Sequence, residues 1–446
     1  MKLKMIVAAV AATASASAFA AGSMNDQVQS GGNIVSVRTD TDYSQQMLSN
    51  QNFTGSVLNI LNARKSGDLA SNAIYIGGKG ELYAEYQSTS SVAAGVHPSG
   101  ASTNNNSSTE VNLPYADLAF TSTIGDWVTG FADLQVSNAA DSSLKLPAAY
   151  FVVGNLSQSP FYGFGGKKVV EFGKFSSPNN FMPTLTRAYF MAYGGQVGTG
   201  FAMNGLDVVA TFMNGKGMAI MNSQASNAQQ LNDFAVNASY TGKAGNLGYY
   251  AGAGYINATG FSANKTTPTL NADGTVSFAN SNKMVGALDF NAGVTVQGLA
   301  VNGEFLVTTS GVKGMNQTSV LGNAVNNTSN SFNSGASHPD SAGFTAFGFN
   351  ALPVLVSFDS GSAVKAWSLD SSYTMPVAGK DMVPYVSYSA AAQNSDNQIY
   401  QVEVGTRYNV IDSVWLGGSY NFMSGKSQGT KVGNFNTLMV DATVYF

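Results

Sequence analysis

Cysteine is absent from the 446-residue sequence, so neither a disulfide framework nor a thiolate metal site can form. Charged residues make up only 10% of the chain, against about 25% in an ordinary soluble protein. Beyond the first twenty residues there is no apolar run of 18 residues, which excludes a spanning helix there. Low charge without a spanning helix favours a closed β-barrel, which satisfies every backbone group within lipid.

Residues 1–20 have the pattern of a secretory signal peptide. Two lysines precede a short apolar stretch over 5–14, and the triplet Ala-Phe-Ala at 18–20 fits a cleavage site. The apolar stretch is shorter than the about 20 residues of a spanning helix, which disfavours the alternative of an N-terminal membrane anchor. We expect the mature chain to begin at Ala21 or Gly22.

Apolar and polar residues alternate along many segments of about 10 residues, as lipid-facing strands require. In the first such segment Ile76 and Leu82 share one face and Glu81 lies on the other. The segments are 74–87, 128–137, 284–295, 299–308 and 400–409. A soluble β-sandwich also alternates, but its outer face should be charged, whereas here the polar face is mostly Gly, Asn, Ser, Thr and Gln. We therefore predict an all-β fold, a transmembrane antiparallel β-barrel.

The connections alternate between tight turns and long polar loops, which is typical of outer-membrane barrels. Tight turns are expected at 124–126, 204–205, 242–246, 297–298 and 411–412. Long loops are expected at 88–110, 176–195, 215–230, 259–282, 311–340 and 424–435. With both termini periplasmic the strand number is even. The pattern gives 16–18 strands, the pair 353–359 and 364–374 deciding between the two, and a barrel of this size leaves an aqueous channel.

The two ends of the chain differ from the barrel body. The last strand alternates up to Val444, Tyr445 and Phe446, which resembles the signal read by the bacterial barrel-assembly machinery. Residues 21–72 do not fit the barrel at 73–446. Within them 57–65 has helical spacing, and Gly67 follows as a C-cap. The extension is periplasmic or lumenal, with a partly disordered linker as the alternative.

One stretch resembles a known family. Residues 148–181 read AAYFVVGNLSQSPFYGFGGKKVVEFGKFSSPNNF, and 74–79 read IYIGGK. Both are similar to segments of the LbtU-type siderophore porins of Legionella, also found in Coxiella and Francisella relatives. The resemblance implies a TonB-independent barrel linked to iron or siderophore uptake. The sequence departs from that family in two places: 24–72 show no heptads, and 175–179 read FSSPN where the family has an aromatic-Val-Pro-Phe-Gly ending.

Charged residues on the polar face are the candidate pore lining, where they would tune ion selectivity. They are Lys79, Glu81, Glu85, Asp117, Asp133, Asp289, Glu304, Glu403, Arg407 and Asp441. Acidic residues outnumber basic ones, which favours cations, although pairing of these groups across the wall is an equally good interpretation. The third long loop is the candidate constriction, by analogy with general porins, with an ordinary surface loop as the alternative. Its residues are Asn179, Asn180, Arg187, Tyr189 and Tyr193.

Other chemistries have little support. The only histidines, His97 and His338, lie in long loops, and no catalytic constellation accompanies them, so we expect no enzyme. The segment 163–168 lacks the spacing of a phosphate loop and is read as a turn. No calcium loop occurs, and we expect no metal and no cofactor. The net charge of −4 falls to −6 when Lys2 and Lys4 are removed with the signal peptide, which disfavours nucleic acid as a partner.

The leading hypothesis is an outer-membrane porin for passive or facilitated diffusion of small solutes. A TonB-dependent receptor would need a plug domain far larger than the about 50 residues before the barrel, within 22 strands. We therefore expect a hollow lumen. The expected partners are outer-membrane lipid, the barrel-assembly machinery, and small solutes or a siderophore. The alternative is a structural or adhesive barrel whose loops contact other surfaces.

Overall fold

The computed structural model describes part of the chain. The described residues are 26–30, 33–50, 54–90, 107–137, 144–179, 181–214, 231–259, 261, 265–270, 276–281, 284–312, 356, 358, 360–427 and 429–446. Asn180, His97, His338 and the signal peptide expected at 1–20 lie outside them.

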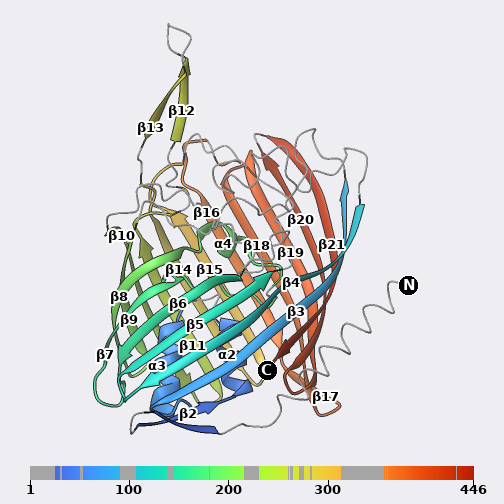
Figure 1. The fold of residues 1–446 in the computed structure, drawn as a ribbon. Helices are drawn as coiled ribbons and strands as arrows, with labels where there is room; N and C mark the ends of the chain where they lie inside the picture. Colours follow the sequence, from blue (N-terminus) through green and yellow to red (C-terminus); the bar gives the residue numbers. More distant parts are fainter. Residues whose placement is uncertain are drawn as a thin grey trace.

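Sixteen antiparallel strands form a closed barrel (Figure 1). Each strand pairs with the next along the chain, and the last pairs with the first, from Asn434 opposite Ser90 to Tyr445 opposite Lys79. The strands are β3 Ala73–Ser90, β4 Ser107–Ile124, β5 Val128–Ser137, β6 Leu144–Gly154, β7 Phe161–Val169, β8 Tyr193–Met203, β9 Leu206–Asn214, β10 Leu231–Ala244, β11 Leu247–Ile256, β14 Ala287–Val296, β15 Leu299–Thr308, β16 Lys365–Tyr373, β18 Lys380–Asn394, β19 Asn397–Ile411, β20 Val414–Ser427 and β21 Thr430–Tyr445. The short β17, Met375–Val377, continues β16 against β18.

Alternation along the strands places apolar side chains outside and polar ones inside. Phe290, Val404 and Val440 are 52%, 52% and 61% exposed, and each neighbours a buried carboxylate on its own strand. Exposed Leu, Val, Phe and Tyr recur on every side of the barrel, and only a hydrocarbon surround covers such a belt favourably. The predicted fold class is confirmed, at the lower strand count.

The tight turns expected at one end of the barrel are confirmed. Asn204 and Gly205 both have positive φ, and so do Gln297 and Gly298, as the mirror-image hairpin turns require. These turns share the end of the barrel that carries the C-terminus, which makes it the periplasmic end (Figure 1).

Three local expectations are wrong. Residues 424–435 are not a long loop, because β20 reaches Ser427 and β21 begins at Thr430. Residues 163–168 lie within β7 rather than in a turn, because their backbone pairs with β6 and β8. The pair expected at 353–359 and 364–374 supplies one barrel strand, β16, because β15 pairs directly with β16, and most of 353–359 lies outside the described residues.

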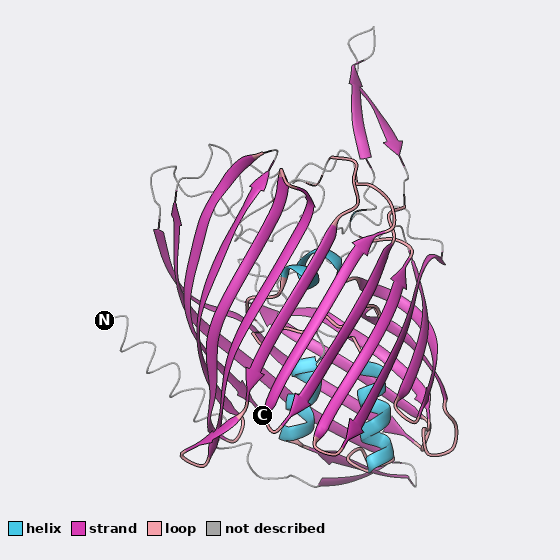
Figure 2. Ribbon diagram, turned by 180° about the vertical axis from the view of Figure 1, so that it is seen from behind, coloured by secondary structure: helices cyan, strands magenta, loops and turns pink. Residues whose placement is uncertain are grey.

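The residues before the barrel form four elements, β1 Asp26–Ser30, β2 Asn33–Arg38, α2 Thr41–Asn50 and α3 Ser56–Ser66. Strand β2 runs parallel to the start of β3, which β21 leaves unpaired. Gly67 has φ of 92° at the end of α3, as expected of its C-cap. Both helices lie inside the barrel near its periplasmic end (Figure 2). No helix of the described part is long and apolar enough to span a membrane.

The connection between β7 and β8 also enters the barrel. Residues 170–192, named here the lumenal segment, carry the short helix α4, Leu185–Phe190, whose six residues are all buried. By contrast, the β11–β14 connection rises above the wall as the hairpin of β12 Lys265–Leu270 and β13 Val276–Ser281 (Figure 1).

Candidate functional site: the lumen

The ten charged residues proposed as pore lining all lie on barrel strands at inward-facing positions. Eight of them are buried, between 0% and 6% exposed, and Glu85 and Arg407 are half-buried. The buried ones are Lys79, Glu81, Asp117, Asp133, Asp289, Glu304, Glu403 and Asp441. They face protein rather than an open channel, so the expectation of a hollow lumen is wrong at this level of the barrel.

Three of these residues form one buried ionic cluster on β3 and β4. The ammonium of Lys79 lies 3.2 Å from a carboxylate oxygen of Glu81 and 3.4 Å from one of Asp117. The amide of Gln135 on β5 donates a hydrogen bond of 2.8 Å to the other oxygen of Asp117. In a low-dielectric wall such groups are stable only when paired. For this cluster, pairing within the wall is the better interpretation.

The lumenal segment is fixed to the far wall through carboxylates. One oxygen of Glu304 on β15 accepts hydrogen bonds from the backbone N–H groups of Lys174 (2.7 Å) and Phe175 (2.9 Å). One oxygen of Glu403 on β19 accepts from the amide of Asn179 (2.5 Å) and from the hydroxyl of Tyr385 (3.0 Å). Hydrogen bonds to a carboxylate are about twice as strong as neutral ones. The lumenal segment therefore crosses the lumen and is held firmly to β15 and β19.

Of the four described residues proposed for the constriction, three lie in the lumenal segment and one lies outside it. Asn179 and Arg187 are buried within the lumenal segment, at 3% and 0% exposure. Tyr189 is buried against Phe358, with ring centroids 5.2 Å apart. Tyr193 is the first residue of β8, outside the segment, and its hydroxyl donates to the carbonyl of Pro147.

Above the charged level, the inward positions become apolar. Ten consecutive strands each contribute one buried inward residue to a layer around α4: Met213, Ala235, Ile256, Ala287, Leu306, Ala366, Ala391, Ile399, Met423 and Phe435. Phe261 and Phe358, from two extracellular connections, pack onto Tyr189 in the same cluster. This layer was not predicted, because a simple alternation of apolar and polar residues predicts an inward face that is polar throughout.

Solvent reaches the inward face near the periplasmic end on the β10–β15 side. Along β14, Asp289 is buried and Thr295, six residues nearer the periplasm on the same face, is exposed. Along β10, Thr241 and Lys243 are exposed at inward positions. The lumen is thus open toward the periplasm on this side. The lumenal segment and the apolar layer lie between that opening and the extracellular end.

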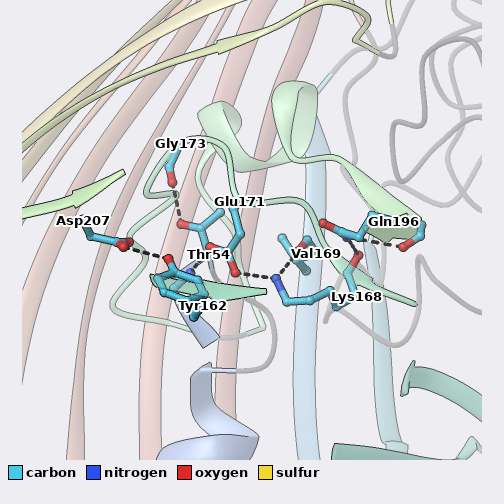
Figure 3. Close-up of polar contacts among 10 residues, drawn as sticks. Thr54, Tyr162, Lys168, Val169, Glu171, Gly173, Gln196 and Asp207 are labelled. Carbon is cyan, nitrogen blue, oxygen red and sulfur yellow. Dashed lines mark hydrogen bonds and ion pairs between the residues drawn. The ribbon is translucent and has the colours of Figure 1, made fainter. Parts of the chain in front are cut away.

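Several lumenal residues were not predicted as site residues. Lys168 on β7 lies 2.5 Å from Glu171, the second residue of the lumenal segment (Figure 3). Tyr162 donates a hydrogen bond of 2.7 Å to Asp207 on β9. The signal for Lys168 and Glu171 in the sequence was the concentration of charge in GKKVVEFGK, inside the stretch that carries the family resemblance.

Lys174 belongs to the lumenal segment and lies next to the β10–β15 side of the lumen, which is open toward the periplasm. Its ammonium lies 5.2 Å from the ring centroid of Tyr250 on β11, a cation–π distance. Burial lowers the pKa of Lys174 below its ordinary value, while Glu304 and Glu171 act in the opposite direction. Within the described residues, no three His, Cys, Asp or Glu side chains come together as metal ligands do.

Comparison with known proteins shows similarity in fold. No family model matches the sequence, and no curated protein is similar to it. The outer membrane channel DcaP of Acinetobacter baumannii superposes with a TM-score of 0.50 at 10% identity, covering 84% of this chain and 97% of that one. A loop-deletion mutant of OmpT from Vibrio cholerae gives 0.49 at 10%, covering 84% and 99%. OprB of Pseudomonas putida gives 0.49 at 9%, covering 83% and 94%.

The closed barrel, its apolar outer belt and its tight periplasmic turns define the class: a transmembrane β-barrel of the outer-membrane type. The similarity to DcaP supports the same fold. The protein accordingly lies in the bacterial outer membrane.

Proposed function

We propose that the protein is an outer-membrane channel for the diffusion of small solutes, with the lumenal segment as its constriction. One observation carries the proposal: a sixteen-stranded barrel, wide enough for an aqueous path, is crossed by the lumenal segment, which side chains of the wall hold in place. Such a loop narrows a path without the large folded plug that energised receptors use.

The lumenal charges favour cations. Of the ten candidate residues, Glu81, Glu85, Asp117, Asp133, Asp289, Glu304, Glu403 and Asp441 are acidic, and Lys79 and Arg407 are basic. A field of one sign along a pore attracts ions of the other. Glu85 and Arg407 are half-buried and carry opposite charges, so they form a matched pair for testing this preference.

Conductance across planar bilayers tests the channel. The purified full-length protein should give discrete current steps, and a KCl gradient should give a reversal potential of cation-selective sign. Glu85→Gln should weaken that selectivity and Arg407→Gln should strengthen it. Absence of steps from protein whose folded state is verified by heat-dependent gel migration would overturn the proposal.

The solute proposed from the family resemblance is a ferric siderophore. The support is the GKKVVEFGK stretch, whose Lys168 and Glu171 lie at the root of the constriction. Uptake of a labelled ferric siderophore by a deletion strain under iron limitation is the test. Reduced uptake, restored by the wild-type gene, supports the siderophore; equal uptake in mutant and parent contradicts it and leaves the general channel standing.

A structural or adhesive barrel is the second candidate. It draws support from the filled lumen and from the β12–β13 hairpin, which stands above the wall (Figure 1). Here no conductance is expected from the wild type or from a variant lacking most of the lumenal segment. Removal of 265–281 should instead reduce binding of cells to surfaces.

A further inference from the structure

We infer that helices α2 and α3, with Thr54 and Gly55 directly before α3, form a displaceable plug that closes the β3–β7 side of the lumen and is latched to the lumenal segment through Glu171. This inference rests on the proposed channel function and adds its regulation. The two segments would then open together, as one gate.

The first helix, α2, packs closely against strands β3 and β4 of the wall. The hydroxyls of Tyr43 on α2 and Thr121 on β4 are hydrogen-bonded at 2.9 Å. A Cβ added at Gly77 of β3 would lie 1.8 Å from the Oγ of Ser44 and 2.5 Å from its Cβ. Only glycine at position 77 leaves room for the Ser44 side chain. The Ser44 side chain of α2 therefore lies directly against the backbone of β3.

The second helix packs its apolar face on the same wall. Val57, Ile60 and Leu61 are at most 2% exposed and join a cluster with inward residues of β3–β7. The opposite face of α3 carries exposed Asn62 and Lys65. An amphipathic helix of this kind fits between a wall and water. Water therefore reaches the far side of the plug.

Thr54 and Gly55, directly before α3, form the latch with Glu171 and Gly173 (Figure 3). The backbone N–H of Gly55 donates to one oxygen of Glu171 at 2.6 Å, and Lys168 lies 2.5 Å from the other oxygen. The hydroxyl of Thr54 donates to the carbonyl of Gly173 at 2.5 Å. One carboxylate thus joins the plug, the wall and the constriction.

The plug is attached non-covalently and through few polar contacts. Among the described residues, the polar contacts of the plug with the wall and the lumenal segment are the two latch bonds, the Tyr43–Thr121 bond and a side-chain hydrogen bond between Ser56 and Tyr150 on β6. In addition, the guanidinium of Arg64 donates to the carbonyl of Gly125 at 2.5 Å. Burial lowers the pKa of Arg64, which nearby Asp126 opposes. The remaining contact is apolar surface, which has no fixed direction. A segment held in this way can leave without breaking the barrel.

A bulky residue on α2 tests the contact between α2 and β3 without altering the wall. Ser44→Trp cannot fit over Gly77, whereas Gln46→Trp, on the exposed face of the same helix, leaves the Ser44–Gly77 contact intact. Because the chain has no cysteine, Ile60→Cys adds a unique probe at a position that is 0% exposed. In folded full-length protein, a water-soluble maleimide should label I60C in the S44W background and leave it unlabelled in wild-type and Q46W backgrounds.

The latch is tested by a second probe, Leu185→Cys in the lumenal segment, also 0% exposed. If the two segments move together, S44W also exposes L185C, and adding Glu171→Gln to S44W reduces that labelling while I60C stays labelled. Labelled I60C with protected L185C in S44W would refute the latch. Protected I60C in folded S44W would refute the plug.

Conductance separates this inference from the proposed function. With a working channel, S44W should give a conductance roughly double that of Q46W, because the plug fills one of the two sides of a lumen of this width. Labelling without current in any variant would support the plug and contradict the channel. Current with equal conductance in S44W and Q46W would contradict the plug.

Discussion

The lumen is filled by two segments that are held by different kinds of force. The plug of α2 and α3 presents an apolar face to the wall and makes few polar contacts with it. The lumenal segment at 170–192 is tied to the opposite wall by Glu304 and Glu403. Apolar contact is nondirectional and tolerates sliding, whereas a buried carboxylate requires its donors in place. The comparison indicates that the plug is the softer element and the lumenal segment the more firmly positioned one.

The largest effect on this comparison is expected from Glu304→Ala. The change leaves the N–H groups of Lys174 and Phe175 without their acceptor in a buried site, which costs about 3 kcal/mol. Docking of the lumenal segment should weaken, with frequent switching of the single-channel current and labelling of L185C. Glu304→Gln keeps an acceptor and should show a smaller loss. An E304A channel as quiet as wild type would mean that the apolar layer alone holds the segment.

The structure of the barrel wall could be predicted from the sequence, whereas the content of the lumen could not. The wall follows a local rule, since alternation sends residues such as Asp289 inward and Phe290 outward, and turn pairs such as Gln297-Gly298 set the hairpins. The inward charges were predicted from that period alone. Their lumenal positions are as expected, while their role as pore lining stays a prediction.

The content of the lumen could not be predicted in the same way. The pairing of Glu304 with the backbone of Lys174 joins residues 130 positions apart, and the bond of Gly55 to Glu171 joins residues 116 apart. No local period encodes such contacts. The helix at 57–65 was predicted, yet its position inside the barrel depends on the packing of Val57, Ile60 and Leu61 against side chains of β3–β7, which composition does not indicate.

A smaller effect is expected from Asn179→Ala. Glu403 would lose the amide donor at 2.5 Å and keep the hydroxyl of Tyr385 at 3.0 Å, so the loss should be about 2 kcal/mol. The urea midpoint of the folded barrel should change little, because β19 keeps its pairing, whereas L185C should become labelled. Tyr385→Phe in the wall is the matched control, since it removes the other donor without touching the segment. Equal protection of L185C in N179A and wild type would argue against this attachment.

The plug should respond less to loss of a polar contact. Tyr43→Phe removes only the hydroxyl that pairs with Thr121, and a neutral hydrogen bond contributes about 1 kcal/mol. The apolar contact of the ring remains, so I60C should stay largely protected. Full labelling of I60C in Y43F would reverse the comparison, because it would mean that the plug too depends on directed polar contacts.

The smallest effect is a dependence on pH that only the lumenal segment should show. The pKa of Lys174 is lowered by burial in the folded state, so the folded state binds its proton less tightly than the unfolded chain. Stability from this group is therefore least at low pH and rises as the pH passes from its lowered folded pKa toward the ordinary lysine value of about 10.4. Lys174→Met should remove that rise. Thermal midpoints of wild type and K174M, measured from pH 7 to pH 10, should diverge in slope, whereas a plug variant such as Y43F should follow the wild-type slope. Identical slopes in wild type and K174M would show that the ammonium is as well solvated in the lumen as in the unfolded chain.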